Sequence, residues 1–298
     1  MILVNKNIYN QHKENTMTFQ TLKKSRSNFS SLQKELEKIK SPETQNYNKN
    51  DERFWRPELD KVGNGYAVIR FLPAPKDEEV PWVRIFNHGF QGPGGWYIEN
   101  SLTTLNKKDP VSEANSALWN SGVEANKELA RKRKRRLTYI SNIYVVSDSK
   151  HPENEGKVFL YKFGKKIFDK ITDRMNPQFE DEKPVNPFDF WEGANFKLKI
   201  RKVEGFTNYD KSEFDNPDAL LKGDDKELEK VYNQQHALQA FADPSNFKTY
   251  EELKARFDRV VGGETPTTTA AESTTTKIKR DDDEEDVDMS YFQNLADD

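Results

Sequence analysis

A run of six cations followed by an aromatic strand carries the residue types in this chain that are best suited to binding chemistry. Residues 131–136 (RKRKRR) lead directly into residues 137–146 (LTYISNIYVV), which are rich in aromatic and β-branched side chains. Alternate side chains of a strand face opposite ways, so Tyr139 and Tyr144 lie on opposite faces. Cations beside such a strand can hold a phosphate backbone while a ring stacks on a base. The pattern therefore predicts a groove for a single-stranded nucleic acid.

The same basic run has two simpler interpretations. Clustered Lys and Arg residues also form nuclear import signals, and a charge run is often only a solvated face. The rest of the sequence is needed to distinguish between the three interpretations, which are a nucleic-acid groove, an import signal and a solvated face.

The composition indicates a folded core with extended polar ends. The 298 residues are 33% charged and 34% hydrophobic, and the mean hydropathy is -0.98. Such a polar chain is expected to have flexible ends around its core. The sequence shows neither an apolar run of about 20 residues, which a membrane span needs, nor a signal-peptide core, so we expect a soluble intracellular protein.

The residue inventory excludes most catalytic and metal chemistry. Cysteine is absent, which rules out disulfides, thiolate metal sites and cysteine nucleophiles. The four histidines are scattered and show no HExxH spacing, so the prediction is no metal site and no cofactor. Carboxylates are dense at the C-terminus, but no paired acidic motif marks the core as a two-metal nuclease. We therefore predict that the protein is not an enzyme.

Charge is segregated along the chain. Residues 281–298 hold nine acids and no Lys or Arg, which leaves 47 basic and 41 acidic side chains in residues 1–280. A few apolar residues lie among these acids, so the tail has the composition of a short docking motif or a competitor for a basic groove. Simple solubilisation is the alternative. The tail residues that we expect to take part in interactions are Asp281, Asp282, Asp283, Glu284, Glu285, Asp286, Tyr291, Phe292 and Leu295.

Hydrophobic periodicity predicts a mixed α+β fold with a small OB-like β-barrel core, helical additions and flexible N- and C-terminal segments. Strands are expected near residues 66–72, 80–86, 96–98, 137–146, 157–163 and 196–201. Helices are expected near residues 30–39, 110–130, 167–174, 226–241 and 249–261. The glycine-rich residues 89–95 lack the Lys-Ser/Thr pair of a phosphate loop, so we predict a hairpin turn there.

Two of these strands differ in the types of side chain on their two faces. In residues 157–163, Phe159, Tyr161 and Phe163 share one face, which suits base stacking, although an aromatic core is the alternative. In residues 196–201, Phe196, Leu198 and Ile200 alternate with cations, as in a strand buried on one side only.

We divide the chain into four parts. Residues 1–16 are a candidate N-terminal extension, 17–45 a segment with one short helix, 46–262 the core, and 263–298 a Thr-rich linker with the acidic tail. The expected helix has a narrow apolar stripe, so it either docks on a surface or frays.

Several blocks of residues, taken in order, resemble one known family. They are GNGYAVIRFLP (63–73), NHGF (87–90), WYIE (96–99), PENEGKVF (152–159), FGKKI (163–167), WEGANF (191–196) and GFTNY (205–209). Over about residues 20–262 the chain is similar to the helix-destabilising single-stranded-DNA-binding proteins of T-even bacteriophages.

The resemblance implies a function and a set of residues. The implied function is cooperative, sequence-independent coating of single-stranded DNA during phage replication, recombination and repair, in the cytoplasm of the infected bacterium. The implied DNA contacts are Arg70, Tyr97, Lys134, Arg135, Arg136, Tyr139, Tyr161, Phe206 and Tyr209. Lys23, Lys24, Ser25, Arg26 and Ser27 match the motif through which one protomer binds the next, and the tail is implied to contact replication and recombination proteins and to shield the groove.

One departure from the family concerns its structural zinc, which is held by one His and three Cys residues. His88 is present here, but the other positions correspond to Ser101 and to residues 109–112 (DPVS). Ser is a poor zinc ligand and no thiolate exists, so the zinc is predicted to be lost. The alternative function that we keep is a single-stranded RNA-binding or translational-repressor module, which the same cations and rings could serve.

Overall fold

The computed structural model describes residues 51–179 and 181–262. The expected helix at residues 30–39, the self-association motif at residues 23–27 and the acidic tail lie outside the described residues. Among the residues described, no helix is both long enough and apolar enough to cross a membrane.

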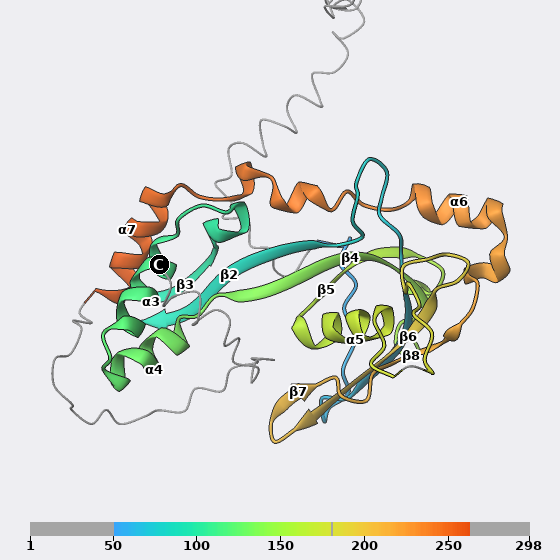
Figure 1. Cartoon of the computed structure of the whole chain (residues 1–298), viewed down its shortest axis with the longest axis horizontal. Coiled ribbons are helices and arrows are strands. Elements are labelled where there is room, and N and C mark those ends of the chain that lie inside the picture. The colour runs from blue at the N-terminus through green and yellow to red at the C-terminus, as the bar shows by residue number, and fades with distance from the viewer. Residues whose placement is uncertain (1–50, 180, 263–298) are drawn as a thin grey trace, which may run out of the picture. The chain divides into compact units, whose positions relative to one another are not determined.

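Eight strands and five α-helices, joined by short 3-10 helices, form the described part of the chain (Figure 1). The strands are β1 (Gly65–Phe71), β2 (Val83–Gly92), β3 (Gly95–Asn100), β4 (Arg136–Ser147), β5 (Val158–Phe163), β6 (Ala194–Val203), β7 (Phe206–Asn208) and β8 (Glu213–Pro217). The α-helices are α3 (Pro110–Asn120), α4 (Glu124–Lys132), α5 (Lys165–Met175), α6 (Asp225–Asn233) and α7 (Tyr250–Val261). The 3-10 helices are η1 (Leu102–Leu105), η2 (Pro152–Asn154), η3 (Leu220–Gly223), η4 (Gln239–Ala242) and η5 (Pro244–Asn246).

The strands pair in the order β3-β2-β4-β1-β6-β7, while β5 pairs with β4 and β8 with β6. Each of these pairings is antiparallel. The sheet and the helices confirm the mixed α+β class. Within the described residues the pairings form one branched path, and closure into an OB-like barrel stays a prediction.

Strand β4 is the centre of the sheet because it pairs with β1, β2 and β5 along its 12 residues. Its β-branched and aromatic residues suit a strand with neighbours on both sides. In Figure 1, β2 and β4 run together from the part that holds β3, α3, α4 and α7 to the part that holds β1, β5 and β6. A side chain on β2 or β4 can therefore line a site that lies between these two groups of elements.

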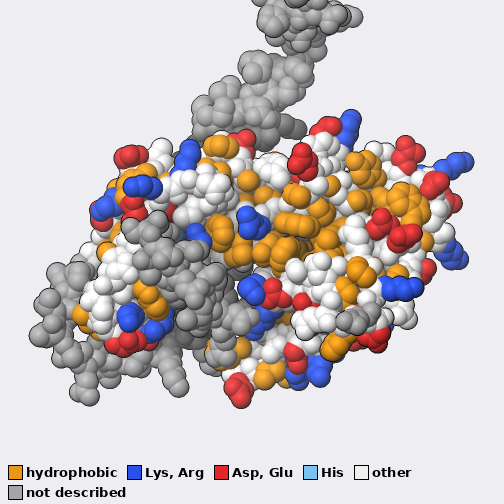
Figure 2. All heavy atoms as spheres, viewed as in Figure 1, with side chains coloured by type: hydrophobic (Ala, Val, Ile, Leu, Met, Phe, Trp, Pro, Cys, Tyr) orange, Lys and Arg blue, Asp and Glu red, His pale blue; other side chains and the backbone are white. Residues whose placement is uncertain are grey.

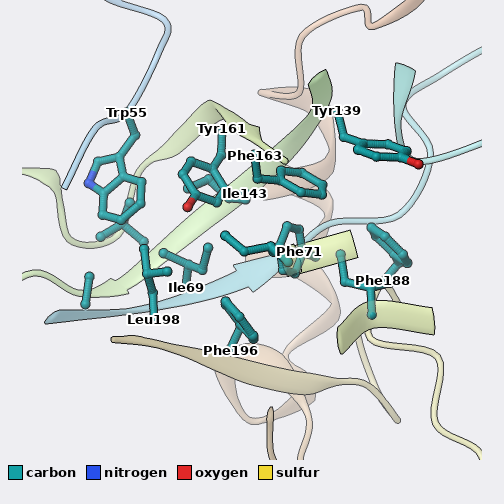
Figure 3. Packing of buried hydrophobic residues seen from close by; sticks show 14 of the residues in the cluster. Trp55, Ile69, Phe71, Tyr139, Ile143, Tyr161, Phe163, Phe188, Phe196 and Leu198 are labelled. Carbon is teal, nitrogen blue, oxygen red and sulfur yellow. The ribbon is translucent and has the colours of Figure 1, made fainter. Parts of the chain in front are cut away.

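Six aromatic rings form a continuous row through the largest part of the core. Consecutive ring centroids lie 5.4, 5.6, 5.7, 3.9 and 5.4 Å apart, in the order Trp55, Tyr161, Phe163, Tyr139, Phe168 and Trp82. Figure 3 shows the first four of these rings side by side. The face of β5 that was expected to offer rings for stacking thus packs in the core, which was the alternative for that strand.

A second core lies under the β2–β3 hairpin. Phe90 and Tyr97 from the hairpin pack against Leu253, Phe257 and Val260 of α7. The predicted hairpin turn is confirmed, since Gly92 pairs with Gly95. Glycine is needed here because a Cβ at Gly94 would lie 2.0 Å from the carbonyl oxygen of Arg259. The turn therefore lets the hairpin lie directly on α7.

The other expected elements are found with shifted bounds. The strand at residues 196–201 buries Phe196, Leu198 and Ile200, as its alternation predicts. Helix α7 begins with a complete capping box between Thr249 and Glu252, which fixes its first residue. The expected helix at 226–241 is wrong in its second half, where α6 ends at Asn233 and only the short η4 follows.

Candidate nucleic-acid interface

The outer end of the aromatic row opens into a pocket of about 480 Å³, which we call the aromatic pocket. It is lined by Val80, Trp82, Val83, Arg84, Thr104, Tyr139, Phe168, Gln239 and Ala242. Tyr139 and Phe168 are stacked, with their centroids 3.9 Å apart and their planes 6° apart. Trp82 meets Phe168 edge-on at 5.4 Å. Figure 2 shows hydrophobic side chains gathered over the middle of the face that Figure 1 presents.

Strand pairing places cations beside these rings. Arg84 of β2 pairs with Tyr139 of β4, so the two side chains share one face of the sheet. Arg84 is exposed. Phe86, two residues further along β2, lies on the same face and carries the Arg135 guanidinium 4.2 Å above its ring. Arg84 of β2 thus lines the pocket, while Arg135, which comes directly before β4, lies over Phe86 of β2.

The six-residue basic run does not form one continuous ladder of cations. Arg131 belongs to α4 and pairs with Glu124 and Glu128. Arg133 is buried, with its guanidinium 5.6 Å from the rings of Phe90 and of Phe257. Burial lowers the pKa of Arg133 to about 10. These two residues therefore stabilise the fold of this region.

The last residues of the run lie on both sides of the sheet. Arg136 pairs with Asn87, so it lies on the opposite face from Arg84, and its guanidinium donates to the carbonyl oxygen of Gly89 at 3.3 Å. Lys134 lies between α4 and β4 and is half-buried, as are Arg135 and Arg136. Of the predicted cations, Arg135 lies over Phe86, on the face of the sheet that carries Arg84, and Arg136 lies on the opposite face at the β2–β3 hairpin.

Three other predicted contacts lie in the interior in this conformation. Arg70 is 1% exposed and donates to the carbonyl oxygen of Asp218. Tyr97 is completely buried under α7, and burial raises the pKa of its phenol. Tyr161 is 5% exposed and packs between Trp55 and Phe163. A base cannot stack on these two rings unless the core opens.

The remaining predicted rings lie on a separate hairpin. Phe206 is exposed at the start of β7, and Tyr209 follows β7 and packs partly against the main core. In Figure 1 this hairpin lies on the other side of α5 from β2 and β4. The expected loop at residues 205–209 is in part a strand, because Val203 and Phe206 pair across a tight turn.

Trp82, Phe168 and Arg84 line the aromatic pocket but were not predicted from the sequence. Trp82 and Arg84 lie in the expected strand at residues 80–86 with alternate spacing, which puts them on one face. Phe168 faces the sheet from α5, and no periodic pattern distinguishes it from a core residue. The alternate spacing of Trp82 and Arg84 was therefore the sequence feature that could have indicated their place in the site.

The residues that match the family's zinc-binding positions form a buried hydrogen-bonded network instead. His88 Nε2 lies 3.2 Å from Asp109 Oδ1, and Nδ1 lies 3.0 Å from the carbonyl oxygen of Arg133. Asp109 accepts from the backbone N–H groups of Leu102, Val111 and Ser112 at 3.0–3.1 Å. Burial opposes the ionisation of Asp109, but the interaction with His88 and the backbone hydrogen bonds from Ser112 and Leu102 outweigh it and hold its pKa at about 2.

This network does not fit a zinc site. The chain has no cysteine, and Ser101 Oγ lies 3.0 Å from the hydroxyl of Thr103. Within residues 51–179 and 181–262, no group of three or more His, Asp or Glu side chains could hold a metal ion. His88 Nε2 and Asp109 Oδ1, which could otherwise coordinate a metal, therefore contact each other.

An aromatic pocket that is lined by an arginine, on an antiparallel sheet, is typical of proteins that bind single-stranded nucleic acids. Comparison with known proteins agrees with this class. The family model described as "gp32 DNA binding protein like" matches residues 63–261. The single-stranded DNA-binding proteins of Enterobacteria phages T2 and T4 are each 43% identical over 222 residues, 72% of this chain and 72% of each relative. A match to that of Escherichia phage SV14 is 48% identical over 58 residues, 20% of this chain and 51% of the relative.

The chain therefore belongs to the gp32 DNA-binding-protein-like family. The family resemblance expected from the sequence blocks is confirmed.

Proposed function

We propose that the chain coats single-stranded DNA cooperatively and without sequence preference, in phage replication, recombination and repair. As a member of a DNA-binding family it is not an enzyme. The observation that carries the proposal is the aromatic pocket, where Tyr139, Phe168 and Trp82 meet Arg84 on one face of the sheet. Host cytoplasm is the compartment that this function implies, and an OB-like barrel is the fold that it favours.

The mechanism follows from the chemistry of these groups. Arg84 and Arg135 would neutralise phosphates and release counterions, which makes binding salt-dependent. Trp82 and Phe168 would stack on bases, and every base has a π-face, so sequence is not read. The remaining predicted contacts, Lys134, Arg136, Phe206 and Tyr209, extend the proposed path beyond the pocket.

A titration with oligo(dT) of increasing length, followed by intrinsic tryptophan fluorescence at several salt concentrations, tests this proposal. Affinity should rise steeply with length and fall with salt. The same titration with matched oligo(U) tests the RNA-binding alternative, which tighter binding of RNA would favour. No binding of either oligonucleotide at low salt would refute both.

Replacing Arg84 with alanine is expected to reduce the salt dependence of binding. Each phosphate contact to a single strand contributes about 0.7 to the slope of log K against log salt, so the slope should fall by about that amount. Arg131→Ala is the matched control, because Arg131 is held by Glu124 and Glu128. Equal slopes for Arg84→Ala and the unmodified chain would show that Arg84 does not contact a phosphate of the bound strand.

Cooperativity is assigned to residues 17–45, within which Lys23, Lys24, Ser25, Arg26 and Ser27 would bind the core of the next protomer. Deleting residues 1–40 should leave the affinity for short oligonucleotides almost unchanged and abolish clustering on long strands. Electrophoretic mobility shifts on long and short oligo(dT) measure both effects. Clustering that persists in the deletion variant would show that the motif has another role.

We also infer that the family's structural zinc is absent from this chain. The missing thiolates and the His88–Asp109 network support this inference. The tail residues 281–298 are proposed to contact replication and recombination proteins.

A further inference from the structure

Two walls of the aromatic pocket come from segments that lie outside the strands and far apart in the sequence. Val80 and Trp82 belong to the loop at residues 72–82 between β1 and β2, while Gln239 and Ala242 belong to η4. Figure 1 shows this loop reaching the chain that runs from α6 to α7. The width of the pocket therefore depends on what joins the loop to η4.

One side chain of the loop makes that connection. Glu78 Oε1 accepts from the backbone N–H of Leu238 at 2.7 Å and from that of Gln239 at 3.1 Å. Leu238 is the N-cap residue of η4 and has no side-chain acceptor of its own. The N–H groups at the start of a helix need an acceptor from elsewhere, and here it comes from a residue 160 positions away in the sequence. Glu78 thus caps η4 from the opposite wall of the pocket.

The conformation of the loop directs Glu78 to this place. Asp77 has a φ of 65°, in the left-handed region that residues other than glycine rarely adopt, although Asp tolerates it better than most. The N–H of Glu78 then donates to the carbonyl oxygen of Pro75 at 3.1 Å, which closes the turn. Strained residues of this kind occur often at binding sites. The turn therefore indicates that the direction of the Glu78 side chain is important.

Stability alone is a poor explanation for Glu78. Its second carboxylate oxygen, Oε2, is buried and has no hydrogen-bond partner among the residues that the structure describes. Burying such an oxygen without a partner costs free energy, which offsets part of what the cap contributes. The chain next to η4 also has a separate attachment to the sheet, because Asn142 of β4 exchanges two hydrogen bonds of 2.9 Å with the backbone of His236. What Glu78 adds is the link between η4 and the loop.

We propose that Glu78 is a positioning residue for the stacking of DNA bases. By holding η4 on the β1–β2 loop, it keeps Gln239 and Ala242 opposite Trp82, so the pocket has its width before a base enters. A pocket that is already ordered loses less side-chain and loop entropy when it binds. Glu78 does not line the pocket itself, and its charge would repel a phosphate, so it acts through the groups that it holds. The proposal rests on the proposed function, because it requires that bases stack in the aromatic pocket.

Three variants separate positioning from charge. Glu78→Ala removes the acceptor, whereas Glu78→Gln removes the charge but keeps an acceptor oxygen. Glu79→Ala removes the same charge from the next residue, which is exposed. Each variant is titrated with oligo(dT) and with an abasic oligonucleotide of equal length, which has the phosphates but no bases. Thermal melting checks that each variant is folded.

Glu78→Ala should bind oligo(dT) on the order of fivefold more weakly, because the walls of the pocket must then be ordered when the base binds. Its affinity for the abasic strand and the salt slope of binding should stay unchanged. Glu78→Gln should restore the affinity for oligo(dT), and Glu79→Ala should not weaken it. A role in folding alone would weaken the binding of both strands, and a role of charge alone would affect Glu78→Gln and Glu79→Ala as much as Glu78→Ala.

Hydrogen exchange in the protein without DNA gives an independent measurement. The amide hydrogens of Leu238 and Gln239 should exchange faster in Glu78→Ala than in Glu78→Gln, Glu79→Ala or the unmodified chain. Unchanged exchange, an unchanged affinity of Glu78→Ala for oligo(dT), or an equal loss on the abasic strand would each overturn the proposal. If the unmodified chain binds oligo(dT) no more tightly than the abasic strand, base stacking itself is refuted, and the proposal with it, even where exchange shows that Glu78 caps η4.

Discussion

Replacing Trp82 with alanine is expected to weaken the binding of single-stranded DNA by about 1–3 kcal/mol, which is about 5- to 150-fold in Kd. Trp82 is half-buried at the aromatic pocket, where its ring meets Phe168 edge-on at 5.4 Å and Phe188 at 5.4 Å. These contacts hold the ring in place before a base arrives, so little side-chain entropy is lost on binding. Fluorescence anisotropy of a labelled oligo(dT) measures the change without relying on the protein's own tryptophans.

Trp191→Ala is the matched control for this experiment. Trp191 is 53% exposed and packs edge-on against Phe190, and it is not part of the aromatic pocket. Its loss should leave Kd unchanged within about twofold, which is about 0.4 kcal/mol. Thermal melting of both variants checks that they are folded. An unchanged Kd for Trp82→Ala, or equal losses for the two variants, would mean that the strand does not use this pocket.

Trp82 also illustrates what the sequence alone can predict. Local rules were sufficient for six of the eight strands described, but not for β7 and β8. The alternation in β6 predicts the burial of Phe196, Leu198 and Ile200, and the glycines at 92–95 predict the hairpin turn. These features depend on neighbours in the chain. Which face of a strand meets the core depends on elements far away in sequence, and the pattern of β5 was compatible with either outcome for Tyr161.

The basic run shows the same limit for the site. As a sequence, residues 131–136 are six equivalent cations. In the structure Arg133 lies against Phe90 of β2 and Phe257 of α7, while Arg131 pairs with acids of its own helix. The chain changes from α4 to β4 within the run, so the side chains of these six residues point in different directions. Composition therefore indicated the class of ligand, but the individual contacts depend on the tertiary fold.

Replacing Asp109 with alanine is expected to destabilise the protein by about 3–5 kcal/mol, because each buried donor that loses its acceptor costs about 1–3 kcal/mol. Asp109 is 1% exposed, lies 3.2 Å from His88 Nε2, and accepts from three backbone N–H groups. Its loss leaves those three donors without their acceptor in the interior. At about 2–4 °C per kcal/mol for a chain of this size, the Tm should fall by about 10 °C.

Asp224→Ala separates the capping role of Asp109 from its buried pairing. Asp224 also caps a helix, and it accepts from the N–H groups of Lys226 and Glu227 at 3.0 and 3.2 Å, but it is exposed. Its replacement should cost about 1 kcal/mol, the usual value for a cap alone. The difference between the two variants then measures what the buried network contributes.

The same melting experiment tests whether the network replaces zinc. If His88 and Asp109 hold this region together without a metal, a strong chelator should leave the Tm of the unmodified chain unchanged, and added zinc should not restore Asp109→Ala. A structural zinc would behave in the opposite way, because its binding free energy is folding free energy and a chelator removes it. A clear fall in Tm with the chelator, together with one zinc ion per chain by elemental analysis, would contradict the inferred loss.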